Sequence, residues 1–515
     1  MKRFLKILLL VVVIFVIFCA YIFFVPHGGA RRKLAEYKKE LIAQGEKLDL
    51  ASLALPRTSG ASNVVTKFLA FSAGWSIPGF VDFPTAMKMM APGAAAISYA
   101  DLDAKLMASY GTNKIYTAQL REILSGATLD FDVDYSQGAD TQLPHLAVIK
   151  RLALQLSQTA RQALHEKDFE EAALDLGAEA DILWLWKQEP VLISSLVRIA
   201  CARIAFGAAW EGLQHNGWND AQLAGLQAKW QQLNFFTNLD SVLAAERAFG
   251  SDWMAKARKF TNVAQLSSVL VLYGTPNPTP TFGDWMGELF KDPKAALKDV
   301  YDRYPKFWIW KSSWSYEEEL CGLQMITAQV EACRRIDILG NCASTLEELP
   351  NQTSNILHTF PKFDNHFLAG FGSMDSVHQR GLVKSAQIEV SRRMLVTAIA
   401  LERYHLRHGN WPETLDELVP EFLPKAPIDF MDGRPLRYKP GTNGLYVLYS
   451  VGMDGKDDGG SAFPQPGETT FSNFADMQDI VWPQPASAQQ IQEFEKQHAK
   501  PTTAPPAVEA PPPAK

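Results

Sequence analysis

The feature that most constrains this chain is an uncharged apolar run near its N-terminus, residues 7–25, which reads ILLLVVVIFVIFCAYIFFV. A helix rises about 1.5 Å per residue, so this run spans about 28 Å, close to the thickness of a bilayer's hydrocarbon core. The apolar part of a cleaved signal peptide is only about 7–15 residues long. We therefore predict that residues 1–25 form an uncleaved single-pass transmembrane anchor. Cleavage near Gly28 or Ala30 is the alternative.

Basic residues flank the run on both sides, and their distribution bears on the orientation of the anchor. Those before the run are Lys2, Arg3 and Lys6, and those after it are Arg31, Arg32, Lys33, Lys38 and Lys39. Because the larger group follows the run, the charges do not place the N-terminus in the cytoplasm and lean toward the reverse. The flanking charge alone leaves the orientation open.

The remaining length and composition indicate a globular body of more than one folded unit. The chain has 515 residues, 47% of them hydrophobic and 21% charged, and a single core rarely grows to that size. The formal net charge of -6 offers no basic stripe, so we expect no nucleic-acid partner. The five cysteines are odd in number and form no CxxC spacing, which argues against a disulfide framework and against a zinc site.

A juxtamembrane linker, residues 26–60, is expected to lead into a helical domain, residues 61–380. Apolar side chains recur at helical spacing from Val148 to Leu164, and Asp168 precedes Glu171 at the spacing of a capping box. Pro190 is placed to open a third helix that ends near Leu213. The pattern predicts an antiparallel helical scaffold with short turns, interrupted by a proline- and aromatic-rich insertion near residues 274–314.

Two clusters in this region suggest chemistry, and each also has a structural interpretation. Asp130, Asp132 and Asp134 alternate in DFDVDY, so a strand would place all three carboxylates on one face, for a cation or as a solvated edge. The second cluster comprises His358, Asp364, His366, Asp375 and His378, at spacings that match no metal-ligand pattern. A hydrolase-like enzyme that uses these clusters is the alternative function, although no hydrolase, nucleotide-binding or zinc-protease motif is present.

Residues 381–482 have the pattern of a small α+β unit. A long helix is predicted from Val383 to His408 and is followed by Gly409, the residue that commonly ends a helix. Thr414 and Glu417 bracket a short second helix. Two strands, residues 436–439 and 445–451, are joined through GTNG, which favours a hairpin.

The motifs of this unit occur in the order LERYHLRHGNWPETLDEL, LPKAP, DGRPLRY, LYSVGMDG and DIVW. In this order they resemble the soluble half of the major pseudopilin of type II secretion systems. The resemblance covers about a hundred residues and implies a long helix leading to a small sheet and a calcium-binding loop. The rest of the chain looks similar to large bacterial envelope proteins of unassigned function.

Three departures separate this chain from a pilus subunit. Some 350 residues lie between the apolar run and Gly381, no processing motif like that of prepilins occurs, and Asp429-Phe430 stands where the family has Asp-Pro. A pilin fuses its apolar helix directly to this unit. We therefore expect that the protein is neither trimmed by prepilin peptidase nor assembled into filaments.

The loop from Leu448 to Gly460 reads LYSVGMDGKDDGG and is the candidate metal site. It fails as an EF-hand, because Lys456 falls at the third ligand position counted from Asp454. The resemblance to the pseudopilin implies a structural Ca²⁺ held by Asp454, Asp476 and Asp479, with Asp457 and Asp458 as substitutes. A solvated acidic turn is the alternative.

The sequence therefore predicts a mainly α protein: a transmembrane helix, an antiparallel helical scaffold and a small C-terminal α+β pseudopilin-like domain. Residues 483–515 are rich in proline and alanine and are expected to be disordered or extended. We favour a structural or adaptor role over an enzyme, with secretion-system or other envelope proteins as partners. A weak calcium site would fill only outside the cytosol, so the expected location is the bacterial inner membrane with the body in the periplasm. The sequence does not identify whether a small molecule is a substrate.

Overall fold

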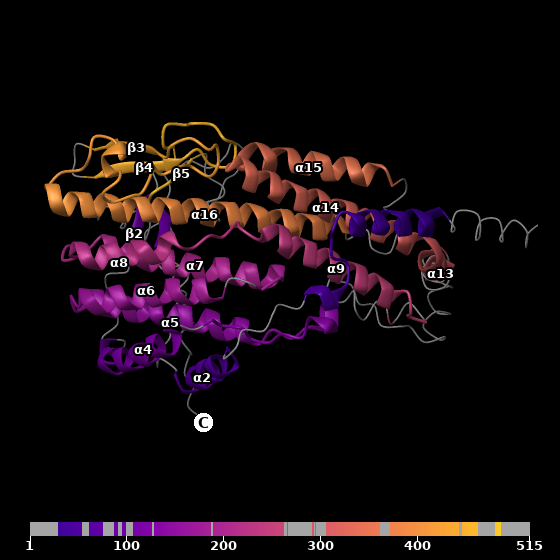
Figure 1. Ribbon diagram of the computed structural model, residues 1–515, viewed down its shortest axis with the longest axis horizontal. Helices are drawn as coiled ribbons and strands as arrows, with labels where there is room; N and C mark the ends of the chain where they lie inside the picture. Colours follow the sequence, from indigo (N-terminus) through magenta and orange to yellow (C-terminus); the bar gives the residue numbers. More distant parts are fainter. Residues whose placement is uncertain are drawn as a thin grey trace, which may run out of the picture.

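The computed structural model describes residues 29–53, 61–75, 87–90, 95–98, 107–125, 128–186, 189–261, 265, 291–292, 294, 305–360, 371–441, 445–461 and 479–485. The predicted transmembrane run, most of the predicted insertion and most of the predicted tail lie outside these residues. The body is mainly helical with small sheets at one side, which agrees with the predicted fold class at that level (Figure 1).

The helices lie close to one long axis of the body, and residues 29–43 form the first of them (Figure 1). The named α-helices are α2 (Ala61–Gly74), α4 (Tyr110–Leu124), α5 (His145–His165), α6 (Phe169–Leu185), α7 (Leu192–Leu213), α8 (Asp220–Gln231), α9 (Leu239–Ala257), α13 (Pro305–Ile309), α14 (Ser315–Leu339), α15 (Ala343–His358) and α16 (Phe371–His408). Shorter turns are η1 (Leu50–Leu53), η2 (Tyr135–Asp140), η6 (Leu415–Leu418) and the π-helical η4 (Trp310–Trp314).

The antiparallel helices α5 to α8 follow the predicted boundaries closely. Asp168 caps α6 by accepting a hydrogen bond from the backbone N–H of Glu171, as the capping-box spacing predicts. Asn219 and Gln222 form a reciprocal capping box at the start of α8. In this part of the chain, local hydrogen bonds at the helix ends determine where each helix begins.

Helix α7 is long and apolar enough to cross a membrane, and among the described residues it is the one helix with both properties. More than half of its most apolar window is buried within the body. It packs against α5, α6 and α16, so its apolar surface is accounted for by the core of the bundle.

Helix α16 is the longest described element, with 38 residues, and it begins twelve residues before the predicted start at Val383. Gly381 was read as the start of a new unit, but it lies inside the helix. A Cβ atom at Gly381 would lie 3.1 Å from Cδ1 of Leu192 on α7. The glycine therefore permits a close approach of two helices and does not end one.

The predicted acidic strand at residues 130–134 is wrong. Asp132 has a left-handed backbone with φ 47°, and Asp134 caps η2 by accepting from the backbone N–H of Ser136. The carboxylate of Asp130 accepts from the N–H of Asp132 at 3.2 Å. Aspartate competes with strand pairing by bonding its own backbone in this way, and here three aspartates within five residues produce turns.

Two small sheets lie on either side of α16. Strands β3 (Arg437–Pro440), β4 (Tyr446–Ser450) and β5 (Ile480–Val481) form an antiparallel sheet in the order β3-β4-β5, which confirms the predicted strand pair. Strands β1 (Met87–Met90) and β2 (Ala95–Ser98) form a hairpin, and β6 (Gln484–Pro485) joins it in parallel. Residues 484–485 of the predicted tail thus take part in a sheet.

One continuous hydrophobic core connects the helical bundle to the C-terminal sheet. Its members extend from Phe68 on α2 to Trp482 after β5. The ring of Trp482 packs edge-on against Phe206 of α7 at 5.6 Å, and the indole N–H of Trp210 donates to the carbonyl of Pro483 at 2.9 Å. The C-terminal residues are thereby attached to the middle of the bundle.

Asp429 holds the C-terminal sheet in place although it is fully buried. Its carboxylate accepts hydrogen bonds from the Ser450 hydroxyl at 2.7 Å and from the backbone N–H groups of Met431 and Val451 at 2.9 and 3.0 Å. It also pairs with Arg437 at 3.1 Å. The side chain therefore joins the loop before β3 to the end of β4.

Replacing Asp429 should destabilise this part of the protein strongly. Asp429→Ala leaves buried N–H donors and a guanidinium without a partner, which costs roughly 3–5 kcal/mol. Asp432→Ala is the matched control, because Asp432 binds the same Arg437 from a more exposed position and should cost on the order of 1 kcal/mol. The measurement is urea unfolding of the full chain in detergent, with tryptophan fluorescence as the readout. Equal midpoints for the two variants would contradict the role given to Asp429.

Candidate functional site

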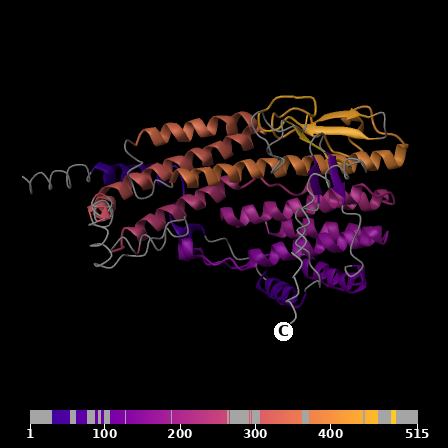
Figure 2. The same ribbon diagram turned by 180° about the vertical axis from the view of Figure 1, so that it is seen from behind.

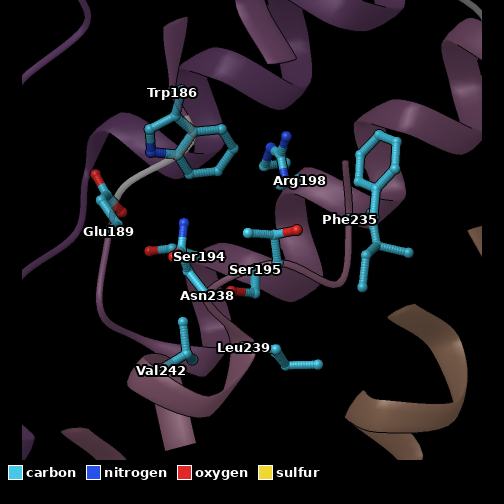
Figure 3. Close-up of a pocket in the computed structure, with 11 residues that line it drawn as sticks. Trp186, Glu189, Ser194, Ser195, Arg198, Phe235, Asn238, Leu239 and Val242 are labelled. Atoms are coloured by element: carbon cyan, nitrogen blue, oxygen red, sulfur yellow. The ribbon is translucent and has the colours of Figure 1, made fainter. Parts of the chain in front are cut away.

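The described residues form a small pocket where the end of α6, the start of α7 and the loop before α9 meet (Figure 3). Its cavity is about 30 Å³, which is room for one or two water molecules. The lining residues are Trp186, Glu189, Ser194, Ser195, Arg198, Ile199, Phe235, Thr237, Asn238, Leu239 and Val242. The pocket combines polar groups on its α6–α7 side with apolar side chains from α9.

A histidine supports the carboxylate of this pocket from behind. His145, the first residue of α5, is 3% exposed, and its Nε2 lies 2.7 Å from Oε1 of Glu189. The ring of Phe131 stacks on His145 at 4.2 Å, and Trp186 meets it edge-on at 6.2 Å. The two rings therefore fix the orientation of His145, which lies against the carboxylate of Glu189 in the pocket wall.

Other polar atoms of the pocket wall have no partner among the described residues. They are Nε1 of Trp186, Oγ of Ser194 and both carboxylate oxygens of Glu189, whose 2.7 Å contact with His145 is an ion-pair distance without hydrogen-bond geometry. Buried donors and acceptors of this kind usually bind ordered water. One or two waters would satisfy the N–H, the hydroxyl and the carboxylate together. The cavity is far smaller than the roughly 300 Å³ at which pockets for organic ligands begin.

Arg198 closes the other side of the pocket and is fully engaged there. Its guanidinium donates to the carbonyls of Leu183 and Asn234, each at 3.0 Å, and lies over the ring of Phe235 at 4.6 Å. Burial lowers the pKa of Arg198 to about 10, so it stays cationic at neutral pH. Its contacts join the end of α6 to the loop before α9, which is a structural task.

A row of buried acidic residues runs along α6 and forms the second candidate, the acidic seam. Glu171, Asp175 and Glu179 follow one another at intervals of four residues, so they share one face of the helix. All three are at most 4% exposed. Arg121 of α4 lies between the first two, 2.9 Å from Glu171 and in contact with Asp175.

The far end of the seam carries more acid than base. Arg161 of α5 pairs with Glu211 of α7 at 2.5 Å and donates to the Ser157 hydroxyl at 2.6 Å. Both carboxylate oxygens of Glu179 lack a hydrogen-bond partner in the part of the chain that the structure describes. Four carboxylates thus face the half-buried Arg121, the buried Arg161 and Lys114, which lies 3.9 Å from Glu171. Burial of the excess acid favours its protonated form.

Burial determines the charge of the seam. It raises the pKa of Asp175 to about 7 and raises the pKa of Glu179 well above its usual range. At neutral pH Glu179 is therefore a neutral acid, and Asp175 is partly protonated. Because the pocket of Figure 3 is lined by other residues, the seam is a polar layer of the helical core and not the wall of that pocket.

The histidines of the second predicted cluster do not form a visible site. His358 ends α15, and His378 lies on α16, where burial lowers its pKa to about 4. Asp364 and His366 are outside the described residues. The described part of the chain contains no group of three or more His, Cys, Asp or Glu side chains arranged to hold a metal ion.

The predicted calcium loop is described in part. Asp454 is half-buried and accepts a hydrogen bond from the N–H of Lys456 at 3.1 Å, and Asp476 lies outside the described residues. Asp479 is buried and accepts from the N–H groups of Gly460 and Ser461 at 2.7 and 3.2 Å. Asp457 accepts from the Tyr449 hydroxyl at 3.0 Å. Backbone N–H groups of the loop thus converge on the carboxylate of Asp479 and hold the loop against it.

Comparison with known proteins adds no support for the resemblance of residues 381–482 to a pseudopilin. No protein-family model, no curated protein and no solved structure matches this chain. The similarity of residues 381–482 to the major pseudopilin of type II secretion systems stays a prediction based on short motifs. The class that the structure itself defines is a mainly helical protein with small three-stranded sheets.

Sequence reasoning overlooked the acidic seam and the pocket, although the seam left a signal. Within FEEAALDLGAEADILWL the acids at positions 171, 175 and 179 share the face on which a buried helix would carry apolar side chains. An acidic stripe on an otherwise apolar helix indicates buried, paired charge. The pocket had no such signal, because His145 and Glu189 are 44 residues apart and belong to no motif.

Protonation of Asp175 should make the stability of the fold depend on pH. The pKa of Asp175 rises from 3.8 to about 7 on folding, so the folded state binds more protons than the unfolded state between these values. Stability is then lost as the pH rises through this window. Asp175→Asn removes that loss, and its unfolding midpoint should improve relative to wild type between pH 5 and pH 8.

Asp168→Asn is the matched control on the same helix. The hydrogen bond from Lys114 lowers the pKa of Asp168 below 3.8, so its contribution is constant from pH 5 to pH 8. The difference between this variant and wild type should not change across that range. Thermal unfolding at closely spaced pH values measures both variants, and parallel profiles for Asp175→Asn and wild type would refute the assignment.

Proposed function

We propose that this protein is a membrane-anchored adaptor of the bacterial envelope that holds a pseudopilin-like unit at a fixed distance from the inner membrane. Secretion-system or pilus-type machinery is the partner class that the resemblance suggests. The observation that carries the proposal is the position of α16, which runs along much of the long axis of the body, with the C-terminal sheet over one end and the helix of residues 29–43 beyond the other (Figure 1).

The geometry of α16 supports a spacer role. Thirty-eight helical residues at about 1.5 Å each span about 57 Å. Helices α7 and α8 cover one side of α16, and β4 and η6 pack against it near its C-terminal end. A helix supported along its length is stiff, so the two ends of the body keep a constant separation.

The same contacts argue against assembly as a pilus subunit. In a pilin the apolar helix extends directly from the soluble unit, whereas here α16 is the helix of that unit and its apolar surface is already buried by the bundle. From Gln387 to Leu401 most side chains of α16 are buried. Packed in this way, α16 is not free to enter a filament, and we expect the purified protein to form none.

An enzymatic role is the second candidate, and the His145–Glu189 pair is the observation in its favour. A carboxylate fixed by a histidine is a typical general base. The cavity beside it is large enough for water but not for an organic substrate of ordinary size. A structural role for the pair is therefore the better account of its geometry.

The adaptor proposal is tested by photo-crosslinking in cells. A photoreactive residue at Arg434, whose side chain is 79% exposed beside the C-terminal sheet, should form adducts with components of a secretion or pilus-type machine. The same residue at Lys259, exposed near the end of α9, is the control and should not form those adducts. Adducts that appear equally from both positions, or none from Arg434, would contradict the proposal.

Calcium is the second part of the proposal. The half-buried carboxylate of Asp454 lies next to a loop whose other acids, Asp457 and Asp458, are exposed, and flexible loops of this kind supply oxygen ligands to Ca²⁺. Asp479 is engaged by backbone N–H groups, so in this arrangement it orders the loop from behind. A weak site fills only outside the cytosol, which favours a periplasmic body.

Calcium at about 1 mM should raise the unfolding temperature of the full chain, while magnesium or a chelator should not. With a dissociation constant on the order of 10⁻⁴ M the gain is roughly 1.4 kcal/mol. Asp454→Ala should abolish the response, and Asp416→Ala, which removes an exposed carboxylate of η6, should leave it intact. Asp479→Ala should lower stability with and without calcium. If the Asp454→Ala variant still responds to calcium, the calcium site at this loop is contradicted and the loop is a solvated turn.

A further inference from the structure

One end of the body is built from the segments that adjoin the predicted anchor. Residues 29–43, α13 and the start of α14 lie together at the right of Figure 1 and at the left of Figure 2, away from the C-terminal sheet. The guanidinium of Arg31 lies 6.0 Å from the ring of Tyr316, the second residue of α14. Lys38 pairs with the buried Glu319 one turn further along α14. The chain that leaves the anchor is thus attached directly to this end.

Trp308 is an exposed aromatic residue at this end. It is 51% exposed, whereas its neighbours Phe307 and Trp310 are buried in a small aromatic cluster with Met254. The ammonium group of Lys311 lies over the ring of Trp308 at 5.4 Å. A large ring with a polar edge beside a lysine is the combination that membrane–water interfaces favour.

The charges at this end are mostly basic, although the chain as a whole carries a net charge of -6. The exposed cations are Arg31, Arg32, Lys33 and Lys259. The acids on the first helix are Glu36, which pairs with Arg32 at 3.8 Å, and the exposed Glu40, whose charge is matched by the exposed Lys39 beside it. Helix α14 adds Glu317, whose pKa is raised by burial. An excess of cations beside a membrane anchor attracts anionic lipid headgroups, at about 1 kcal/mol for each Lys or Arg near the surface.

We infer that this end of the body sits in the headgroup layer of a phospholipid bilayer, with Trp308 inserted and the basic residues against anionic lipid. The inference rests on the membrane anchor of the proposed function and adds an orientation to it. The long axis then stands away from the membrane, and the C-terminal sheet lies at the distal end of α16.

The test uses a fluorophore that reports contact with lipid. Trp308→Cys is labelled with an environment-sensitive dye in a Cys19→Ala background, because Cys201, Cys321, Cys333 and Cys342 are buried and should not react. The full chain is reconstituted into phosphatidylcholine–phosphatidylglycerol vesicles that contain a nitroxide-labelled lipid. Ile338→Cys is the matched control, since Ile338 is apolar and 84% exposed at the opposite end of α14.

The label at position 308 should be quenched severalfold more than the label at position 338. Lys259→Cys, a second exposed position at the same end, should also be quenched. Replacing phosphatidylglycerol by phosphatidylcholine should weaken the quenching at both 308 and 259. Flotation of the vesicles reports the anchor separately. Protein that floats with equal quenching at 308 and 338 overturns the orientation and leaves the anchor intact, whereas protein that does not float overturns both.

Discussion

The burial of α16 on opposite sides is the constraint on which the rest of the structure depends. Most side chains of α16 from Ser385 to Leu401 are buried, so other elements must surround the helix. Here the bundle covers one side and the C-terminal sheet covers another. The sheet has only short strands, which are marginally stable alone. Its stability therefore derives from the helix beneath it and from the bundle that fixes this helix.

Buried charges determine how the helices fit against α16. Glu389 is fully buried, pairs with Arg392 and Arg393 at 2.6 and 3.0 Å, and accepts from the backbone N–H of Phe235 at 3.3 Å. Burial opposes its ionisation, but the two arginines outweigh that effect and lower the pKa of Glu389. Arg393 in turn lies 4.7 Å from the ring of Phe430. One carboxylate thus connects the helix, the loop before α9 and the C-terminal unit.

Such a network specifies position more than it adds stability. A buried ion pair gains little net free energy over a well-packed apolar pair, but a shift of register would leave its charges unpaired at a cost of several kcal/mol. The acidic seam on α6 works in the same way, since Arg121 and Arg161 reach it from two other helices. For the proposed adaptor, which would hold two ends apart, a fixed register is the useful property.

Local patterns in the sequence predicted the helices well, because caps and apolar periodicity act over a few residues. Asp168 and Thr414 begin their helices where their side chains predict. The errors came from contacts between distant residues. Gly381 reads locally as a break, and only its approach to Leu192, 189 positions away, explains a continuous helix. The pairing of β6 with β2 and the His145–Glu189 pair are equally non-local.

Two electrostatic arguments about topology point in opposite directions, and the structure offers a way to reconcile them. Basic residues after the predicted anchor favour a cytoplasmic body by the positive-inside rule, whereas the proposed weak calcium loop favours the periplasm. The rule counts charges on loops, but Lys38 pairs with Glu319, Arg32 with Glu36, and Lys33 lies near Glu317. Charges neutralised within the folded body contribute less to the positive surface than a count suggests.

Because folding follows insertion, however, the neutralisation affects the orientation only if these acids already lie near the bases when the predicted anchor inserts. Glu36 meets this condition, because it lies three residues from Lys33 and four from Arg32 in the sequence. Glu317 and Glu319 do not meet it, because they are far away in the sequence. The calcium response therefore discriminates between the two topologies better than any count of flanking charge.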